Sequence, residues 1–236
     1  MRYWISILFI VVFTSIAYAQ DAPSEDEIKQ VILAEGPMTV IGTFENESGF
    51  EAIIESYGCV SIDNTEYGLE LLTVLNSQID QTIWRTEQLI SCGGLGTYGF
   101  QFVRWVGDVL YFDSGREGSP HGASFAFIVE PLFRYDVAQN TGEAEPLGSA
   151  LFSHRGDYLV TWDTSGIITI TTADMMERQS ITLDIPDLAI ANVIWLPDQR
   201  GVIIIQIDDI MLPQDSLVTY IDRESMTQTA LLNSQN

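Results

Sequence analysis

Residues 150–185, ALFSHRGDYLVTWDTSGIITITTADMMERQSITLDI, decide the fold of this chain. The stretch contains three short runs of branched and aromatic residues, a composition that favours extended backbone: Leu159–Trp162, Ile167–Thr171 and Gln179–Leu183. Arg155-Gly156-Asp157 and Asp163-Thr164-Ser165-Gly166 stand between runs, and Gly, Asp and Ser are the residues of tight turns. The stretch is therefore predicted to be a meander of short strands.

A related pattern recurs in the chain after residue 38. Trp105, Phe152 and Trp195 each precede a turn and an apolar strand, at separations of 47 and 43 residues. Each unit continues with a strand that ends in an acidic turn: RYDVAQNTG, TTADMMERQ and TYIDRESMT. A period of about 40–45 residues with four strands per unit is typical of β-propeller blades. The apolar run Val202–Ile205 fits an inner blade strand that is covered on both faces.

Two of these elements, WLPDQRGVIII (195–205) and FSHRGDYLVTW (152–162), resemble the W-S-P-D-G-x-x-L-x-F opening of TolB-like and WD-repeat-like bacterial propellers. LFRYDVAQNTGEAEPL (132–147) resembles their D-[ILV]-Y-x-x-D-x-x-T-G-x closing strand and turn. The resemblance covers about residues 100–232, and 38–90 more loosely. Pro197-Asp198 survives in one unit only, and no unit has the full pentapeptide. The resemblance implies blades that present loops to partners, and it implies no shared catalytic residue.

The fold class is thus predicted to be all-β and β-propeller-like, with about four to five four-stranded blades in a domain over residues 38–236. A strand at 39–44 that pairs into the last blade would close the ring. A partial propeller completed by a partner chain and a two-sheet β-sandwich stay open as alternatives.

The first 19 residues have the three regions of a secretory signal peptide. They are Arg2, the apolar run Trp4–Phe13, and the small-x-small triplet Ala17-Tyr18-Ala19. The run is shorter than the roughly 20 residues of a membrane-spanning helix, so no stable span is expected after cleavage. The chain is predicted to be periplasmic, cell-surface or extracellular.

Residues 20–37 are predicted to form an N-terminal helical segment that either packs on the body or only tethers it. Ser24 and Glu27 have capping-box spacing, and a short helix is expected over about residues 24–34. Gly36-Pro37 would end it.

Cys59 and Cys92 are the only cysteines, and an oxidising compartment favours a disulfide between them. On the chain-entropy model such a loop stabilises the fold by about 3–4 kcal/mol. Two free buried thiols are the alternative.

The charge balance is strongly acidic, with 33 Asp and Glu against 10 Lys and Arg and a formal net charge of −23. Such a surface repels phosphate backbones, so nucleic acid is excluded as a partner, whereas cations or basic partners fit. His121 and His154 are the only imidazoles, and no zinc set can be assembled. The segment 63–68 departs from a calcium loop at its third and fifth positions. No metal site and no cofactor are predicted, although calcium held by scattered oxygens stays open.

No catalytic motif is found: the chain lacks a G-x-S-x-G elbow, a phosphate loop and an H-E-x-x-H pair. A glycosidase needs only two carboxylates, so a secreted hydrolase with an acidic pair at the central channel is the alternative function. Arg155-Gly156-Asp157 matches an adhesive tripeptide but falls where the blade needs a turn.

The candidate binding residues lie in two rim loops, 93–99 and 113–122. The second, DSGREGSPHG, carries Arg116, Glu117 and His121, and Tyr98 belongs to the first. Long loops on a rigid scaffold commonly carry binding. The predicted function is therefore an exported, non-enzymatic binding module for a protein or a glycan, of unspecified oligomeric state.

Overall fold

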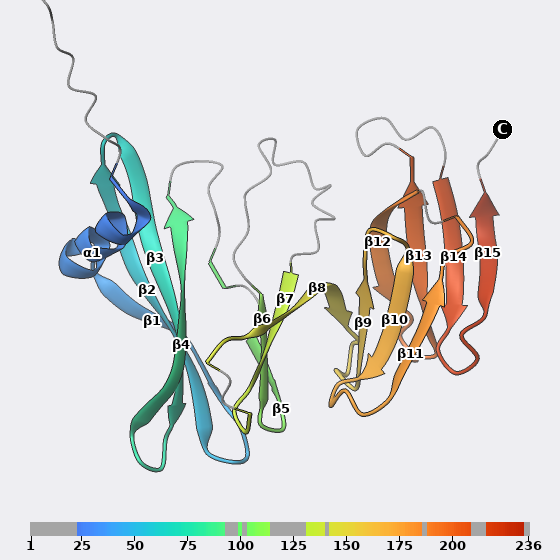
Figure 1. The fold of residues 1–236 in the computed structure, drawn as a ribbon, viewed down its shortest axis with the longest axis horizontal. Coiled ribbons are helices and arrows are strands. Elements are labelled where there is room, and N and C mark those ends of the chain that lie inside the picture. Colours follow the sequence, from blue (N-terminus) through green and yellow to red (C-terminus); the bar gives the residue numbers. More distant parts are fainter. Residues whose placement is uncertain are drawn as a thin grey trace, which may run out of the picture.

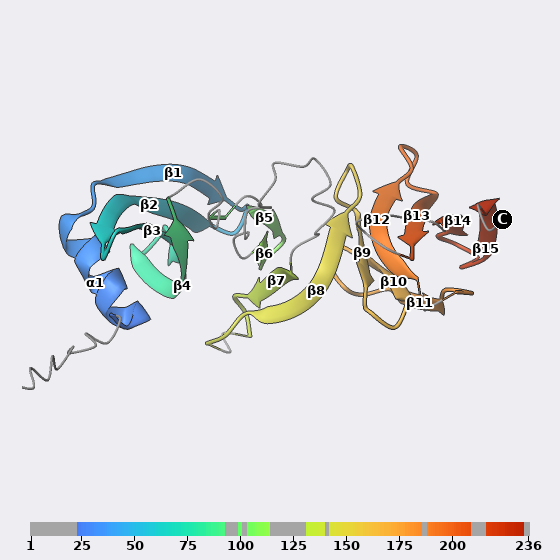
Figure 2. The same cartoon turned by 90° about the horizontal axis from the view of Figure 1, so that it is seen from above.

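The computed structural model describes residues 23–92, 99–100, 103–113, 131–139, 142–185, 188–208 and 216–233. These ranges contain one helix and fifteen strands. The strands form four successive antiparallel units, which we call blade 1 (β1–β4), blade 2 (β5–β8), blade 3 (β8–β11) and blade 4 (β12–β15). Figures 1 and 2 show the blades arranged in a row, with blade 1 at one end of the longest axis and blade 4 at the other.

Blade 1 is a meander of four long strands in the order β1-β2-β3-β4. Its strands are β1 (Met38–Glu45), β2 (Phe50–Ile62), β3 (Thr65–Asn76) and β4 (Gln81–Ser91). Asp63 and Asn64 form the β2–β3 turn with φ angles of 49° and 66°. Positive angles at both central residues are typical of a two-residue hairpin turn, so the segment once compared with a calcium loop is a hairpin.

Blades 2 and 3 are joined into one seven-stranded sheet because they share a strand. The first part of β8, Glu145–Ser149, pairs with β7, and its second part, Ser149–Phe152, pairs with β9. The strands of this sheet are β5 (Val103–Val106), β6 (Val109–Asp113), β7 (Pro131–Asp136), β8 (Glu145–Phe152), β9 (Tyr158–Trp162), β10 (Ile167–Thr172) and β11 (Arg178–Thr182). The last strand of one blade therefore continues directly into the first strand of the next.

Blade 4 is again a four-stranded meander, in the order β12-β13-β14-β15. Its strands are β12 (Ala189–Trp195), β13 (Gly201–Ile207), β14 (Ser216–Asp222) and β15 (Gln228–Asn233).

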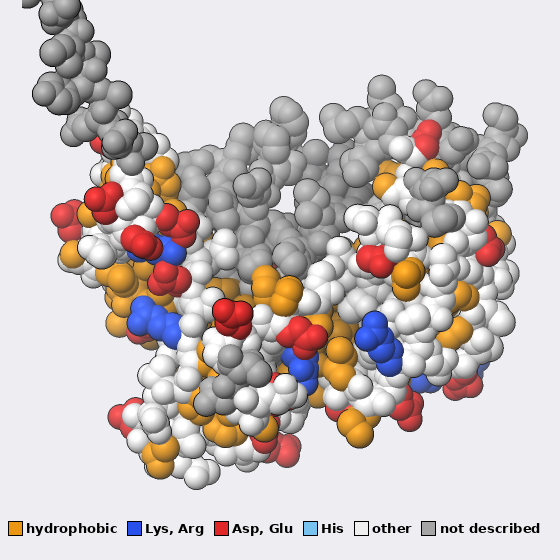
Figure 3. Space-filling model, in the orientation of Figure 1, with side chains coloured by type: hydrophobic (Ala, Val, Ile, Leu, Met, Phe, Trp, Pro, Cys, Tyr) orange, Lys and Arg blue, Asp and Glu red, His pale blue; other side chains and the backbone are white. Residues whose placement is uncertain are grey.

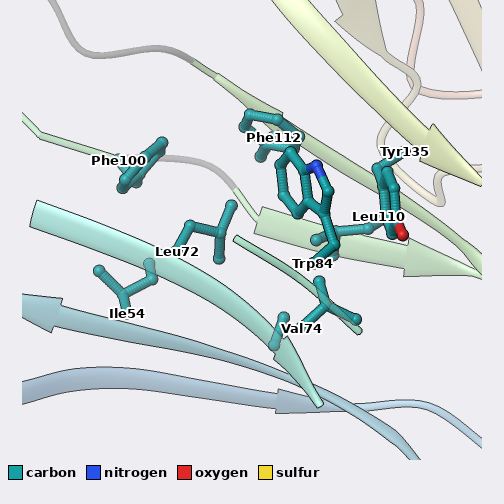
Figure 4. Packing of buried hydrophobic residues seen from close by; sticks show 9 residues of the cluster. Ile54, Leu72, Val74, Trp84, Phe100, Leu110, Phe112 and Tyr135 are labelled. Carbon is teal, nitrogen blue, oxygen red and sulfur yellow. The ribbon is translucent and has the colours of Figure 1, made fainter. Parts of the chain in front are cut away.

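Each interface between neighbouring blades has its own hydrophobic core. Between blades 1 and 2, Trp84 of β4 stacks on Tyr135 with ring centroids 4.4 Å apart and lies 5.4 Å from Phe112 (Figure 4). Buried Tyr111 and Leu159 belong to the core of blades 2 and 3, and Trp195 to that of blades 3 and 4. Stability is thus built from nearest-neighbour contacts, as in repeat proteins.

Helix α1 (Glu25–Glu35) packs on the face of blade 1 that points away from blade 2. Ser24 is its N-cap and forms a reciprocal capping box with Glu27, as predicted. Ile28 and Ile32 are buried against Leu69 and Leu71 of β3. The helix is therefore part of the folded body.

The prediction of an all-β, blade-like repeat with a short N-terminal helix is confirmed. The acidic turns close the blades as expected: Asp136, Asp174 and Asp222 each accept hydrogen bonds from backbone N–H groups two or three residues further on. Of the two alternatives for the ring, the pairing of a strand at 39–44 into the last blade does not occur, because β1 is an edge strand that pairs with β2 and lies far from blade 4. The four successive meanders also differ from the two sheets of a β-sandwich.

Candidate interaction face

Four residues predicted to bind a ligand lie outside the described part of the chain: Tyr98, Arg116, Glu117 and His121. His154 lies in the β8–β9 turn, where its side chain is exposed. Arg155-Gly156-Asp157 forms the same turn, with Gly156 at φ +81° and its N–H bonded to the Ser153 carbonyl at 2.9 Å. The tripeptide therefore has a structural role in blade 3, as expected.

The predicted disulfide between Cys59 and Cys92 is present, with Cα atoms 6.0 Å apart. Cys59 lies where the pairing of β2 with β3 shifts register, and Cys92 directly follows β4. The backbone N–H of Cys92 donates to the Glu66 carbonyl at 2.9 Å. The bond ties the second strand of blade 1 to the end of its fourth strand.

The first strands of successive blades are linked through the residues that define the sequence repeat. The Trp105 indole N–H donates to the Phe44 carbonyl at 2.9 Å, and the Trp195 indole N–H donates to the Leu151 carbonyl at 3.0 Å. Phe152 takes the tryptophan's place in blade 3 and has no such donor. There the Arg104 guanidinium lies 5.4 Å from the centre of the Phe152 ring and donates to the Arg155 carbonyl at 2.9 Å.

The most polar group inside an interface between blades is the carboxylate of Glu70, which is 7% exposed. It accepts a hydrogen bond from the Phe100 N–H at 2.8 Å. Burial raises its pKa, the Phe100 hydrogen bond opposes that rise, and the nearby Asp113 carboxylate adds to it. A Cβ at Gly99 would overlap this carboxylate, so the backbone at 99–100 runs directly over Glu70.

A cavity of about 350 Å³ opens beside the aromatic core between blades 1 and 2. Trp84, Phe100, Phe112 and Phe133 contribute rings to its lining, but the first three are 3–8% exposed. Their rings therefore serve the core more than a ligand. A second cavity, of about 230 Å³, lies between blades 3 and 4, where the Arg223 guanidinium covers the Tyr158 ring at 4.0 Å. That contact anchors the β14–β15 turn to blade 3.

No group of three or more His, Cys, Asp or Glu side chains suited to a metal ion occurs among the described residues. In the same ranges, no helix has the length and apolarity to cross a membrane.

The side of blade 4 that points away from blade 3 is an apolar sheet face, which we call the open face. Burial alternates along β13. The side chains of Val202, Ile204 and Gln206 are buried, as expected of a face that packs on blade 3. Ile203, Ile205 and Ile207 point the other way and keep part of their surface exposed. Cross-strand pairing assigns twelve side chains to this face: Ala189, Asn192, Ile194, Ile203, Ile205, Ile207, Ser216, Val218, Tyr220, Asp222, Thr229 and Leu232.

Exposure on the open face is substantial for large aliphatic side chains. Ile194 is 42% exposed and Leu232 is 57% exposed, whereas Val202, Ile204 and Ile221 on the opposite face are fully buried. The run Val202–Ile205 was predicted to be covered on both faces, and that prediction is wrong for its outward residues. Sequence reasoning missed this face because an uninterrupted apolar run does not tell which side finds a neighbour.

The outward face of blade 1 is partly covered by helix α1. Helix α1 covers its upper part, and Lys29 bridges Glu25 of the helix and Glu87 of β4, each at 2.7 Å. The rest of that face carries charged side chains, among them Glu51 and Arg85, together with the half-exposed aliphatic side chains of Met38 and Val40. Figure 3 shows acidic and basic side chains beside hydrophobic ones at this end of the molecule.

No protein-family model and no curated protein matches this chain. Among solved structures, the chain is similar to the β-propeller domain of Cps50 (Swd1) from Myceliophteria thermophila, at 10% sequence identity and a TM-score of 0.36. The match covers 85% of this chain and 75% of that one.

Proposed function

We propose that this chain is an exported, non-enzymatic blade-repeat module that binds another protein chain through the open face of blade 4. The proposal rests on one observation: the open face of blade 4 resembles the face of blade 3 that blade 4 covers. Val160, Ile168 and Ile170 of blade 3 are buried against blade 4. On the outward face of blade 4, Ile205 and Val218 form the matching cross-strand pair of the second and third strands. Such a surface gains free energy when another chain covers it.

A protein suits the open face better than a glycan does. Its twelve side chains include one aromatic ring, Tyr220, one carboxylate at the margin, Asp222, and three short polar groups, Asn192, Ser216 and Thr229. Glycans need hydrogen-bonding groups for their hydroxyls, whereas a flat aliphatic surface is covered best by another apolar surface. The proposal therefore adopts the partial propeller that a partner chain completes.

We propose that this binding takes place outside the cytoplasm, after export of the chain. The signal-like segment 1–19 and the Cys59–Cys92 disulfide both suit an oxidising compartment. The opening and closing motifs shared with TolB-like and WD-repeat-like propellers support the same kind of module, one that acts by holding partners.

The rim loops 93–99 and 113–122 are proposed as a second contact region, for a protein or a glycan, through Tyr98, Arg116, Glu117 and His121. Their support is the composition of a long loop that carries both charges in an otherwise acidic chain. No cofactor is proposed for this module, and calcium held by scattered oxygens stays the alternative.

One observation favours the alternative of a hydrolase: Glu70 has a raised pKa and Asp113 lies near enough to contribute to it. A general acid needs such a carboxyl. However, Glu70 is 7% exposed and binds the backbone at Phe100, which suits a structural role better. The hydrolase alternative would be favoured if the Glu70→Gln variant folded normally and had lost a glycosidase activity of the unmodified chain.

A photo-crosslinking amino acid placed at Leu232 tests the proposal in the organism's own exported fraction. Leu232 lies on the open face, and Ile79, 64% exposed in the β3–β4 turn of blade 1, is the matched control position. We expect a protein adduct from position 232 and none from position 79. Equal labelling from both positions, or none from either, would overturn the proposal.

A further inference from the structure

The open face carries one charged side chain in a chain that is dominated by charge. Of its twelve side chains only Asp222 is charged, although the chain carries 33 acidic residues. Asp222 lies at the margin of the face, opposite Gly201, where its carboxylate accepts hydrogen bonds from the Tyr220 hydroxyl at 3.2 Å and from the Ser225 backbone N–H at 2.9 Å. A basic partner attracted by the net charge of −23 would find no carboxylate to pair with at the centre of this face.

The two ends of the row differ in a way that restricts how copies of the chain can associate. Stacking head to tail would place blade 4 of one copy on blade 1 of the next. Helix α1 occupies that position, with Ile32 fully buried on Leu69 and Leu71. The helix therefore obstructs a flat head-to-tail contact at one of its two surfaces, and both filaments and rings of copies need that contact. An isologous contact between two open faces does not involve the helix.

We propose that the open face packs against the open face of a second copy about a twofold axis. This rests on the proposed function, because it names the chain that covers the face. Flat antiparallel sheets stack about 10 Å apart with their strands near −30°, and Ile203, Ile205 and Ile207 would form the central row of the contact. The pair would form a row of eight blades with a helix at each outer end.

The size of the face corresponds to a weak homodimer, near the lower limit of specific interfaces. Four strands about 4.8 Å apart and six residues at about 3.4 Å each give roughly 400 Å² of flat area per copy. Two copies together bury roughly 800 Å² of flat area, without the additional surface of the protruding side chains. Side-chain relief raises this value toward the lower limit of stable interfaces, about 1,200 Å².

Charge predicts an unusual salt dependence for this dimer. Two chains that each carry −23 repel one another over long range, while the contact itself contains no ion pair. Salt screens the repulsion, since the Debye length falls from about 10 Å at 0.1 M to about 3 Å at 1 M. The dimer should therefore tighten as salt rises, opposite to a complex held by charge complementarity.

The test is sedimentation of the full chain, purified after expression with its own N-terminal segment, at several concentrations in 0.05 M and 0.5 M salt. Ile194→Glu and Leu232→Glu each place a carboxylate on the open face, and Ile79→Glu makes the same change in charge in blade 1. All three positions are exposed, so a far-UV spectrum and a melt are expected to match those of the unmodified chain. We expect a dimer that is tighter at high salt. Each open-face variant should weaken it at least about tenfold, because a buried unpaired carboxylate is costly, and Ile79→Glu should leave it unchanged.

Three outcomes would overturn this inference. They are a monomer at high concentration in 0.5 M salt, a dimer that Ile194→Glu and Leu232→Glu leave intact, and assembly into species larger than a dimer. Crosslinking from position 232 separates the two proposals. An adduct to a different protein from a monomeric chain keeps the proposed function and refutes the dimer, whereas the absence of any adduct refutes both.

Discussion

The indole N–H of Trp105 in blade 2 donates a hydrogen bond of 2.9 Å to the backbone carbonyl of Phe44 in blade 1. Trp195 repeats the link at 3.0 Å between blades 4 and 3. The residue that recurs in the sequence at the start of a blade thus joins that blade to the one before it. The recurring tryptophan of the sequence repeat therefore marks a hydrogen bond between neighbouring blades.

Trp105→Phe should lower the free energy of unfolding by about 1–3 kcal/mol, because it keeps most of the ring and leaves the Phe44 carbonyl without its partner. Urea denaturation followed by fluorescence measures the loss. Trp162→Phe is the control, since the indole N–H of that residue makes no hydrogen bond within the described structure. Equal losses from both substitutions would mean that ring size and not the link is responsible.

Arg104 and Gly156 should show coupled effects on stability. Arg104→Ala removes the donor to Arg155 and the contact with Phe152, for a loss of about 1–2 kcal/mol. Gly156→Ala should cost more, because the residue has φ +81° and its Cβ would overlap the Arg104 guanidinium. In the double variant the second loss should shrink, as a double-mutant cycle in urea would reveal. Additive losses would contradict the arrangement.

Breaking the Cys59–Cys92 disulfide should lower the free energy of unfolding by about 3–4 kcal/mol. A paired Cys59→Ser, Cys92→Ser variant is compared with the unmodified chain in thermal melts with and without reductant. Reductant should lower the melting temperature of the unmodified chain and leave that of the variant unchanged. Faster hydrogen exchange should be concentrated in β2–β4, and an even loss of protection over all blades would argue against independent blade stabilities.

Glu70→Gln should make the chain less sensitive to rising pH. Burial raises the pKa of Glu70 in the folded state, so the folded chain holds this proton more tightly than the unfolded chain does. The stabilisation is fully present below the ordinary glutamate pKa and is lost as pH rises through the raised one. Glutamine keeps an oxygen for the Phe100 N–H without the charge. The variant should therefore gain stability over the unmodified chain as pH rises toward neutrality, measured by urea denaturation at several pH values. A constant difference across pH would refute this assignment.

Ile32→Ala should destabilise blade 1 by about 2–4 kcal/mol, because the side chain is fully buried between α1 and β3. Val31→Ala, at a position that is 37% exposed on the same helix, is the control and should cost little. Chemical denaturation measures both. Equal small effects would mean that the helix is only loosely attached.

Short-range features were predictable from the sequence by itself. The capping box of Ser24 and Glu27, the turns at Gly156 and Asp222 and the strand runs depend on residues a few positions apart. Those neighbours are fixed by the chain, so spacing and residue type suffice. The pairing of Cys59 with Cys92 followed because no other thiol exists.

Only the tertiary structure decided which faces of the blades are covered. Ile204 and Ile205 are adjacent and identical in type, yet one is fully buried on blade 3 and the other belongs to the open face. β1 likewise has the residues of a strand that could pair anywhere, and it became the edge of blade 1. The physical reason is that burial depends on which distant surface packs against a strand, and that is set by the stacking of whole blades and by α1 at one end of the row.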